Sequence, residues 1–182
     1  MQTMIATSEG GRLRYIDDCY IKIGDFTFKM YIMPEISDSH AANYNSKNGT
    51  GRSIPTYAFA NGDKRSISWT VHLFADSSEA LEFNLKLLRM LESLTYPRSN
   101  ARTLPFLPPN IVKLKCGEVL GSYELCAVLT NYSVKFPTDV PWSPQMNGRS
   151  YIPYKFDIDC SFEAVYDSGT LPGAERILSD GN

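Results

Sequence analysis

Apolar and polar residues alternate along much of the chain with a period of two. In four stretches every second residue is apolar, and these are 26–33, 65–74, 111–116 and 151–166. A period of two is that of a β-strand with one buried side. The stretch 122–136 is instead apolar on both faces at 125–129, which is typical of a central strand. The pattern therefore predicts a sheet with one apolar and one polar face.

One helix is predicted, at 76–95. Asp76 with Glu79 resembles a capping box, and Tyr96-Pro97 supplies the stop. Apolar residues, mostly leucine, cover more than half of the helical circumference, whereas an ordinary surface helix buries a stripe about 100° wide. We therefore expect this helix to be covered on two sides, by its own sheet and by something else.

The remaining segments lack a hydrophobic period. The segment 35–55 is rich in Ser, Asn and Gly and is predicted to be a long loop that forms a contact surface. The segment 97–109 carries four prolines and is predicted to be a stiff, extended crossover. Residues 1–23 are interpreted as an N-terminal arm and 167–182 as a C-terminal tail, which leaves 24–166 as the domain. We expect the loop 35–55 and the ends 1–15 and 167–182 to become ordered on assembly.

The predicted order of elements is three strands, one helix and three strands, with a short strand before the Asn61-Gly62 turn signal. This order predicts an α+β fold, in which a mostly antiparallel sheet or sandwich packs on one main helix. The acidic positions of 151–166 do not fit inside a small closed barrel. They do fit the wall of a wide ring that is filled with water.

The composition limits the function. The chain has 182 residues, of which 43% are hydrophobic, and its net charge is −2. This excludes global disorder and argues against a dedicated binder of DNA or anionic membranes, which relies on many lysine and arginine contacts. No apolar run approaches the roughly 20 residues of a membrane helix, and the N-terminus lacks the pattern of a signal peptide. We expect one domain, made in a cytoplasm.

The four cysteines, Cys19, Cys116, Cys126 and Cys160, are widely spaced. They form no CxxC pair and have no histidine nearby. This spacing predicts buried free thiols in a reducing compartment rather than a disulfide framework or a zinc site.

Catalytic motifs are absent from the sequence. It contains no nucleophile elbow, phosphate-binding glycine loop or zinc-binding HExxH pattern. His40 and His72 have no accompanying nucleophile in the pattern, and Asp157 with Asp159 is typical of a solvated strand face. We expect no catalysis, no cofactor and no metal site.

Two other functions stay open on the residues alone. One is a small-ligand-binding α+β barrel, in which the ligand lies against Trp69 and Tyr154. The other is a hydrolase of unrecognised type that uses Asp157, Asp159 and His72. The unbroken polar strand faces argue against the first, and the missing nucleophile argues against the second.

The stretch 69–166 resembles the tail-tube initiator proteins, also called tail-tube junction or cap proteins, in the baseplates of contractile-tailed bacteriophages. The likeness is carried by the strand "RSISWTVHLFAD", the helix end "LRMLESLTYP", the crossover into "LPPNIVKLKCGEVL", the strand "CAVLTNYSVKF", Pro141-Trp142 and the long final strand. Glu118 stands where aspartate is expected, and Lys135-Phe136 where tryptophan is common.

The resemblance implies a structural protein that acts by assembly and is related to tail tube proteins. Six copies of such a protein form a ring, in which their sheets join into one β-barrel around a channel. The implied partners are further copies of the chain, the tail tube protein or a second tube initiator, baseplate hub proteins, the tape measure protein and, transiently, DNA in the lumen. The crossover 97–109 would contact a neighbouring subunit. The implied location is the virion tail, assembled in the host cytoplasm.

In such a ring, the polar faces of 65–74 and 151–166 are predicted to line the channel. The channel-lining residues are then Ser66, Ser68, Thr70, His72, Lys155, Asp157, Asp159, Ser161 and Glu163. The last strand contributes more acids than bases, so we expect a negative wall along which DNA slides without sticking. The opposite register would expose Phe156 and Ile158 to the water of the channel, and we expect it to be rejected.

Overall fold

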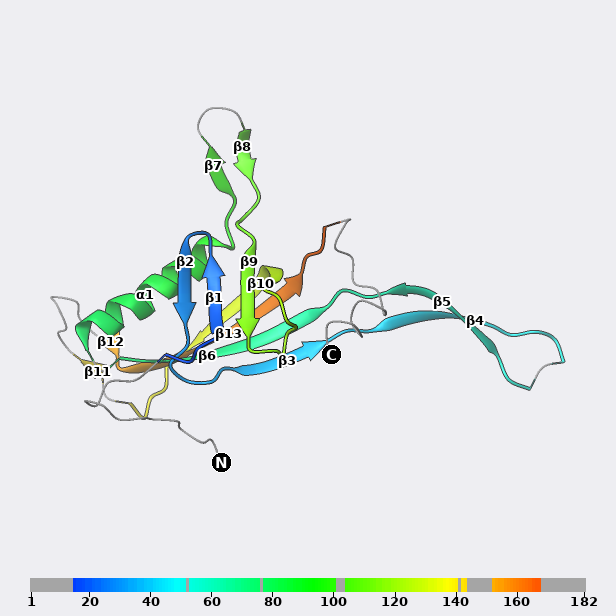
Figure 1. Cartoon of the computed structure of the whole chain (residues 1–182), viewed down its shortest axis with the longest axis horizontal. Coiled ribbons are helices and arrows are strands. Elements are labelled where there is room, and N and C mark those ends of the chain that lie inside the picture. Colours follow the sequence, from blue (N-terminus) through cyan, green and yellow to red (C-terminus); the bar gives the residue numbers. More distant parts are fainter. Residues whose placement is uncertain are drawn as a thin grey trace.

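The body of the protein is an antiparallel sheet that packs on one helix (Figure 1). The computed structural model describes residues 15–51, 53–75, 77–100, 104–140, 142–143 and 152–167. In this part of the chain, seven strands form the main sheet, in the spatial order β2 (Phe26–Lys29), β1 (Cys19–Ile23), β9 (Val112–Cys116), β10 (Leu125–Lys135), β13 (Lys155–Ala164), β6 (Ser66–Phe74) and β3 (Glu35–Ser39). Each neighbouring pair is antiparallel. The predicted α+β class is confirmed.

The helix α1 spans Ser78–Ser93, close to the predicted limits. Its N-cap is Ser77, whose side-chain oxygen accepts a hydrogen bond from the backbone N–H of Ala80 at 3.2 Å. Asp76, which the sequence suggested for this role, lies outside the described residues. The serine therefore provides the capping bond.

The main sheet curves around α1. Near one edge, the ring of Phe28 in β2 lies 5.1 Å from that of Phe83 on the helix. Towards the other edge, Asn84 Nδ2 on the helix donates to the Phe74 carbonyl at the end of β6, at 3.1 Å. The apolar surface of the helix is wide because strands from both parts of the sheet contact it. The strand that covers the second side, β2, belongs to this same sheet, whereas the expected second cover was something other than the sheet.

The apolar sheet face and the helix enclose the core. Its largest buried side chains are Trp69, Phe28, Phe156, Phe162, Ile21, Ile67, Leu87, Leu91, Leu114, Ile158, Val71 and Val112. Most of them occupy alternate positions of strands, which explains the period of two in the sequence. No helix of the described chain is long and apolar enough to span a membrane.

The structure corrects the expectation of a loop at 35–55. Strand β3 lies in this segment and forms an edge of the main sheet. Next, β4 (Ala42–Lys47) pairs with β5 (Thr56–Gly62) in a long hairpin that projects from the body (Figure 1). Both faces of this hairpin are exposed, and β4 shows no hydrophobic period. Strand β5 matches the short strand predicted before Asn61-Gly62, but it pairs with β4 and includes both of these residues, so the predicted turn there is wrong.

The segment 97–109 also differs from the predicted straight crossover. It contains β7 (Arg98–Asn100) and β8 (Leu104–Leu107), which pair as a second projecting hairpin (Figure 1). Prolines at 97, 108 and 109 lie on either side of it. The short strands β11 (Trp142–Ser143) and β12 (Ile152–Pro153) form a further pair.

The predicted N-terminal arm and C-terminal tail also differ from, or lie mostly outside, the described structure. The expected N-terminal arm 1–23 includes β1, which belongs to the main sheet, and its residues 1–14 lie outside the described chain. Most of the predicted tail 167–182 lies outside it too. The sheet is open at β2 and β3, and no pairing between them closes a barrel within the described residues.

Candidate functional site

The nine predicted channel residues lie on one face of two neighbouring strands. Across the β6–β13 ladder, Asp157 is opposite His72, and Ser161 is opposite Ser68. The residues between them point into the core, where Phe156 and Ile158 are fully buried against the layer that includes α1. The register is therefore the expected one. That this face lines a channel stays a prediction.

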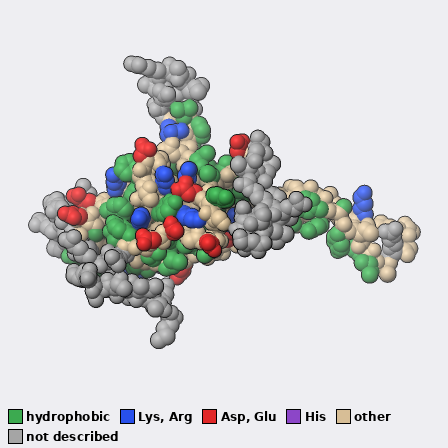
Figure 2. Space-filling model, viewed as in Figure 1, with side chains coloured by type: hydrophobic (Ala, Val, Ile, Leu, Met, Phe, Trp, Pro, Cys, Tyr) green, Lys and Arg blue, Asp and Glu red, His purple; other side chains and the backbone are tan. Residues whose placement is uncertain are grey.

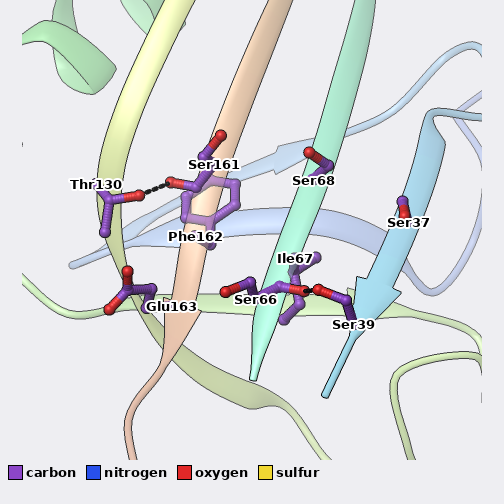
Figure 3. A pocket seen from close by; sticks show the side chains of 9 residues that line it. All are labelled: Ser37, Ser39, Ser66, Ile67, Ser68, Thr130, Ser161, Phe162 and Glu163. Atoms are coloured by element: carbon purple, nitrogen blue, oxygen red, sulfur yellow. Dashed lines mark hydrogen bonds between the residues drawn. The ribbon is translucent and has the colours of Figure 1, made fainter. Parts of the chain in front are cut away.

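The same polar face continues onto both flanking strands, which the sequence did not indicate. Ser37 and Ser39 of β3 lie opposite Ser68 and Ser66 of β6. The resulting hollow, about 300 Å³ in volume, is lined by Ser37, Ser39, Ser66, Ile67, Ser68, Thr130, Ser161, Phe162 and Glu163 (Figure 3). Ser39 donates to the Ser66 carbonyl at 3.3 Å, and Thr130 to the Ser161 carbonyl at 3.0 Å. Small hydroxyl groups dominate this surface.

Each acid of the predicted set has a basic or histidine partner. Asp159 lies 2.6 Å from Lys135, and Asp157 lies 2.8 Å from His72 Nδ1. Glu163 pairs with Lys64. The negative wall expected in a ring stays a prediction. In the single chain, Lys135 and Lys64, which lie on neighbouring segments, offset two of the three carboxylates.

The pKa values reflect these pairs. The hydrogen bond from Lys135, and then that from Thr70, lowers the pKa of Asp159. The hydrogen bond to Asp159 raises the pKa of Lys135 in turn. Likewise, Glu163 raises the pKa of Lys64. The charged forms of Asp159, Lys135 and Lys64 are thus favoured.

The polar face changes character towards the other edge of the sheet, where lysines dominate. The residues concerned are Lys22 of β1, Lys29 of β2, and Lys113 and Lys115 of β9. Glu124 accepts hydrogen bonds from Lys113 and from Tyr20, both at 2.9 Å, and these bonds lower the pKa of Glu124. This end of the face is basic, whereas the β6–β13 end is nearly balanced.

Among the described residues, no nucleophile lies beside the His72–Asp157 pair. The Nδ1 of His72 faces Asp157, but the neighbouring hydroxyl, that of Thr70, donates to Asp159 at 2.8 Å. The described residues contain no group of three or more side chains suited to hold a metal ion. The His72–Asp157 and Thr70–Asp159 contacts join β6 to β13 and stabilise the sheet.

The β4–β5 hairpin forms an exposed apolar surface that the sequence did not predict. Tyr44, Tyr57 and Phe59 are 59–67% exposed, and Ile54 near the tip is 73% exposed. The rings of Tyr44 and Phe59 lie 5.8 Å apart, in contact with each other. Figure 2 shows these apolar patches on the hairpin, whereas charged groups of both signs mix over the body. Exposed patches of this kind are typical of protein contact sites.

A second apolar surface lies at the base of the β7–β8 hairpin. It is a hollow of about 640 Å³, lined by Arg98, Pro108, Pro109, Asn110, Ile111, Val128, Leu129 and Val165. Ile111 is 52% exposed there. Aliphatic side chains and prolines form most of the wall.

Comparisons with known proteins give a weak structural likeness. No protein-family model and no curated protein matches the chain. Among solved structures, the chain is similar to part of the sheath-tube complex of an extracellular contractile injection system, PVC, in its extended state. The TM-score is 0.37 and the identity 10%, over 82% of this chain and 85% of the other. A likeness of this degree does not by itself assign a fold or a function.

Proposed function

We propose that the chain is a structural subunit of a contractile tail and assembles with copies of itself into a ring. More specifically, the ring is a hexamer in a phage baseplate, which joins the central hub to the tail tube and initiates tube assembly. The resemblance of 69–166 to tail-tube initiators suggests this role. The observation that carries it is the β4–β5 hairpin, whose apolar side chains are exposed to solvent (Figure 2).

An isolated two-stranded hairpin is marginally stable in water, and this one gains little from its own body. Contact with another subunit would bury Tyr57, Phe59 and Ile54. The apolar hollow beside Ile111 and Leu129 offers a surface of matching chemistry on a second copy. Because hairpin and hollow are different surfaces, their contact is head-to-tail, and such contacts form rings when the rotation closes.

The open sheet edges support the same arrangement. The outer backbone groups of β2 and β3 have no pairing strand in the described chain, and edges of this kind readily pair with other chains. Sheets joined in this way would place the polar face of β6 and β13 on the inside and α1 on the outside. In this proposal the face lines the channel.

The partners follow from the proposed position of the ring. The tail tube protein or a second tube initiator would contact one side of the ring, and hub proteins would contact the other. The tape measure protein and, transiently, DNA would occupy the lumen. The hydroxyl-rich surface around Ser68 and Ser161 presents no concentrated positive charge that would retain phosphates.

Light scattering with negative-stain imaging tests the proposal. The purified chain is expected to form closed rings, either alone at high concentration or after addition of a tail tube protein. A protein that stays monomeric under both conditions, with no rings in the images, would contradict it.

The ligand-binding alternative is not favoured by the structure. Trp69, which it places against the ligand, is fully buried in the core between the sheet and α1. The apolar hollow of suitable size lies elsewhere, at the base of the β7–β8 hairpin.

A further inference from the structure

Cys19 and Cys116 face each other across β1 and β9. They are direct partners in the strand register. The N–H of Gly117 donates to the carbonyl of Asp18 at 2.8 Å, which makes the cysteines a non-hydrogen-bonded pair, the type whose side chains lie closest in an antiparallel ladder. On the side of β1 that faces β2, the Cys19 carbonyl accepts a hydrogen bond from the N–H of Met30 at 3.0 Å. The two thiols therefore meet between β1 and β9.

The geometry is close to that of a disulfide. The Sγ atoms of this pair are 3.5 Å apart. Non-hydrogen-bonded partners have Cα atoms about 4.5 Å apart, and disulfides span Cα separations of about 4.4–6.8 Å. A disulfide bond is about 2.05 Å long, so closure needs an approach of roughly 1.5 Å between the sulfurs. The other cysteines have no such partner: Cys126 lies opposite Lys113, and Cys160 opposite Trp69.

We propose that Cys19 and Cys116 are a redox-sensitive site, which stays as two thiols in a reducing compartment and closes to a disulfide when the protein meets a peroxide. The peroxide oxidises one thiol to a sulfenic acid and leaves as water. The sulfur of the second cysteine then attacks the sulfenic sulfur, the Sγ–Sγ bond forms, and a second water leaves. Two electrons pass from the thiols to the peroxide.

Burial slows this reaction without preventing it. Both cysteines are 1% exposed, and desolvation, followed by the hydrogen bond to Cys116, raises the pKa of the Cys19 thiol well above its ordinary value. Little thiolate is present at neutral pH, so oxidation is slow. The pair also lies at the end of its ladder, next to Asp18 and Gly117, both of which have positive φ. Ladder ends open locally, which admits a small oxidant.

Closure would fix the β1–β2 hairpin to the rest of the sheet. This hairpin carries Phe28, which covers Phe83 of α1. The cysteines are 97 positions apart, and a crosslink that closes so long a loop restricts the unfolded chain strongly. We expect oxidation to raise the Tm by roughly 5–15 °C. This inference does not depend on the proposed function.

The test compares reduced and oxidised forms of the full chain. The reduced protein is treated with hydrogen peroxide and then unfolded in denaturant that contains an alkylating reagent for free thiols. The product is analysed by intact mass and peptide mapping. The expected product is a monomer that has lost about 2 Da, is alkylated at two fewer cysteines, and carries a crosslink between the peptides of Cys19 and Cys116. Its Tm should exceed that of the reduced form, and a reductant should reverse the difference.

Two variants complete the design. Cys126→Ser removes a partly exposed thiol and is expected to leave the crosslink intact. Cys116→Ser is expected to abolish it. Since the main comparison uses two states of one wild-type protein, it holds even if a variant fails to fold. Full alkylation after peroxide treatment, oxidation of these thiols to sulfinic acid, a crosslink elsewhere, or an unchanged Tm would each overturn the proposal.

Discussion

The side chains of Lys135 and Asp159 meet diagonally on the polar face of the sheet. The register places Lys135 opposite Asp157, yet its Nζ lies 2.6 Å from the carboxylate of Asp159. Asp157 instead contacts His72, at 2.8 Å. The carboxylates of this face are thus arranged in local pairs, and Lys155, Ser68 and Ser39 are exposed beside them.

The Lys135–Asp159 ion pair leads to a prediction about the stability of the fold in acid. The pKa of Asp159 is lowered from its ordinary value of 3.8, so its contribution to folding is fully present above that pH and is lost as the pH falls through the lowered value. Asp159→Asn should therefore destabilise the protein at pH 7 and make little difference at about pH 2. The effect is small, because solvent screens a pair of this exposure. Urea unfolding of both proteins at several pH values measures it.

The control for this prediction is Glu118→Gln, which removes an exposed carboxylate without a recorded ion pair. Its difference from wild type should stay near zero at both pH values. A destabilisation by Asp159→Asn that is equally large at low pH would show that the carboxylate charge is not its cause.

A second prediction concerns the contact between α1 and the sheet. Asn84 is 1% exposed, and its Nδ2 donates to the Phe74 carbonyl, while its Oδ1 has no hydrogen-bond partner among the residues that the structure describes. Asn84→Ala should cost about 1–2 kcal/mol of unfolding free energy. Asn84→Asp should cost more, because it removes the donor and places a charge in the core.

Denaturant unfolding at pH 7 measures both changes. Glu82→Ala, on the exposed side of the same helix, is the matched control and should remain within about 0.5 kcal/mol of wild type. An Asn84→Asp variant as stable as wild type would contradict the described contact.

The sequence predicted those strands that bury one face. In β6 and β13, core residues such as Trp69 and Phe156 alternate with polar ones, and the period of two follows directly from this burial. The β4–β5 hairpin has no buried side, so β4 around Tyr44 shows no hydrophobic period, and only the short strand that contains Phe59 was predicted. A segment without a buried side lacks the hydrophobic pattern of a core.

The sequence predicted which residues of β6 and β13 share the polar face, but it did not predict which side chains pair with one another. The alternation placed Asp157 and Asp159 on one face correctly. Their partners depend on which strands are neighbours and on the register shift at Leu129/Asn131, and neither is encoded in the spacing along one strand. The role of Lys135 therefore emerged only from the three-dimensional arrangement.

A third prediction separates assembly from folding. Tyr57→Ser combined with Phe59→Ser should change the unfolding free energy by less than about 0.5 kcal/mol, because both side chains are exposed. The same variant should weaken self-association at least about tenfold, since buried aromatic anchors dominate protein interfaces. Light scattering over a concentration series measures the association.

The matched control is Tyr123→Ser, which removes an equally exposed ring from a different part of the surface. It should assemble as wild type does. Normal rings from the hairpin variant would show that the hairpin is not an assembly contact.

The last prediction tests whether the polar face lines a channel. Ser68 is exposed on this face, opposite Ser161, and its side chain makes no hydrogen bond or ion pair with another residue of the described chain. Replacing Asp157 or Asp159 would break their pairs with His72 and Lys135, so Ser68→Lys is the cleaner change. It should preserve the fold and add one positive charge per subunit to the lumen.

Assembled Ser68→Lys rings should retain linear duplex DNA at low salt and release it as salt rises. A closed circular duplex of the same sequence cannot thread a ring and should be retained far less. Ser93→Lys, an equal change of charge on the exposed side of α1, is the control, and its rings should not distinguish the two DNA forms. If Ser68→Lys rings bind linear and circular DNA equally, the added charge lies outside the lumen and the channel assignment fails.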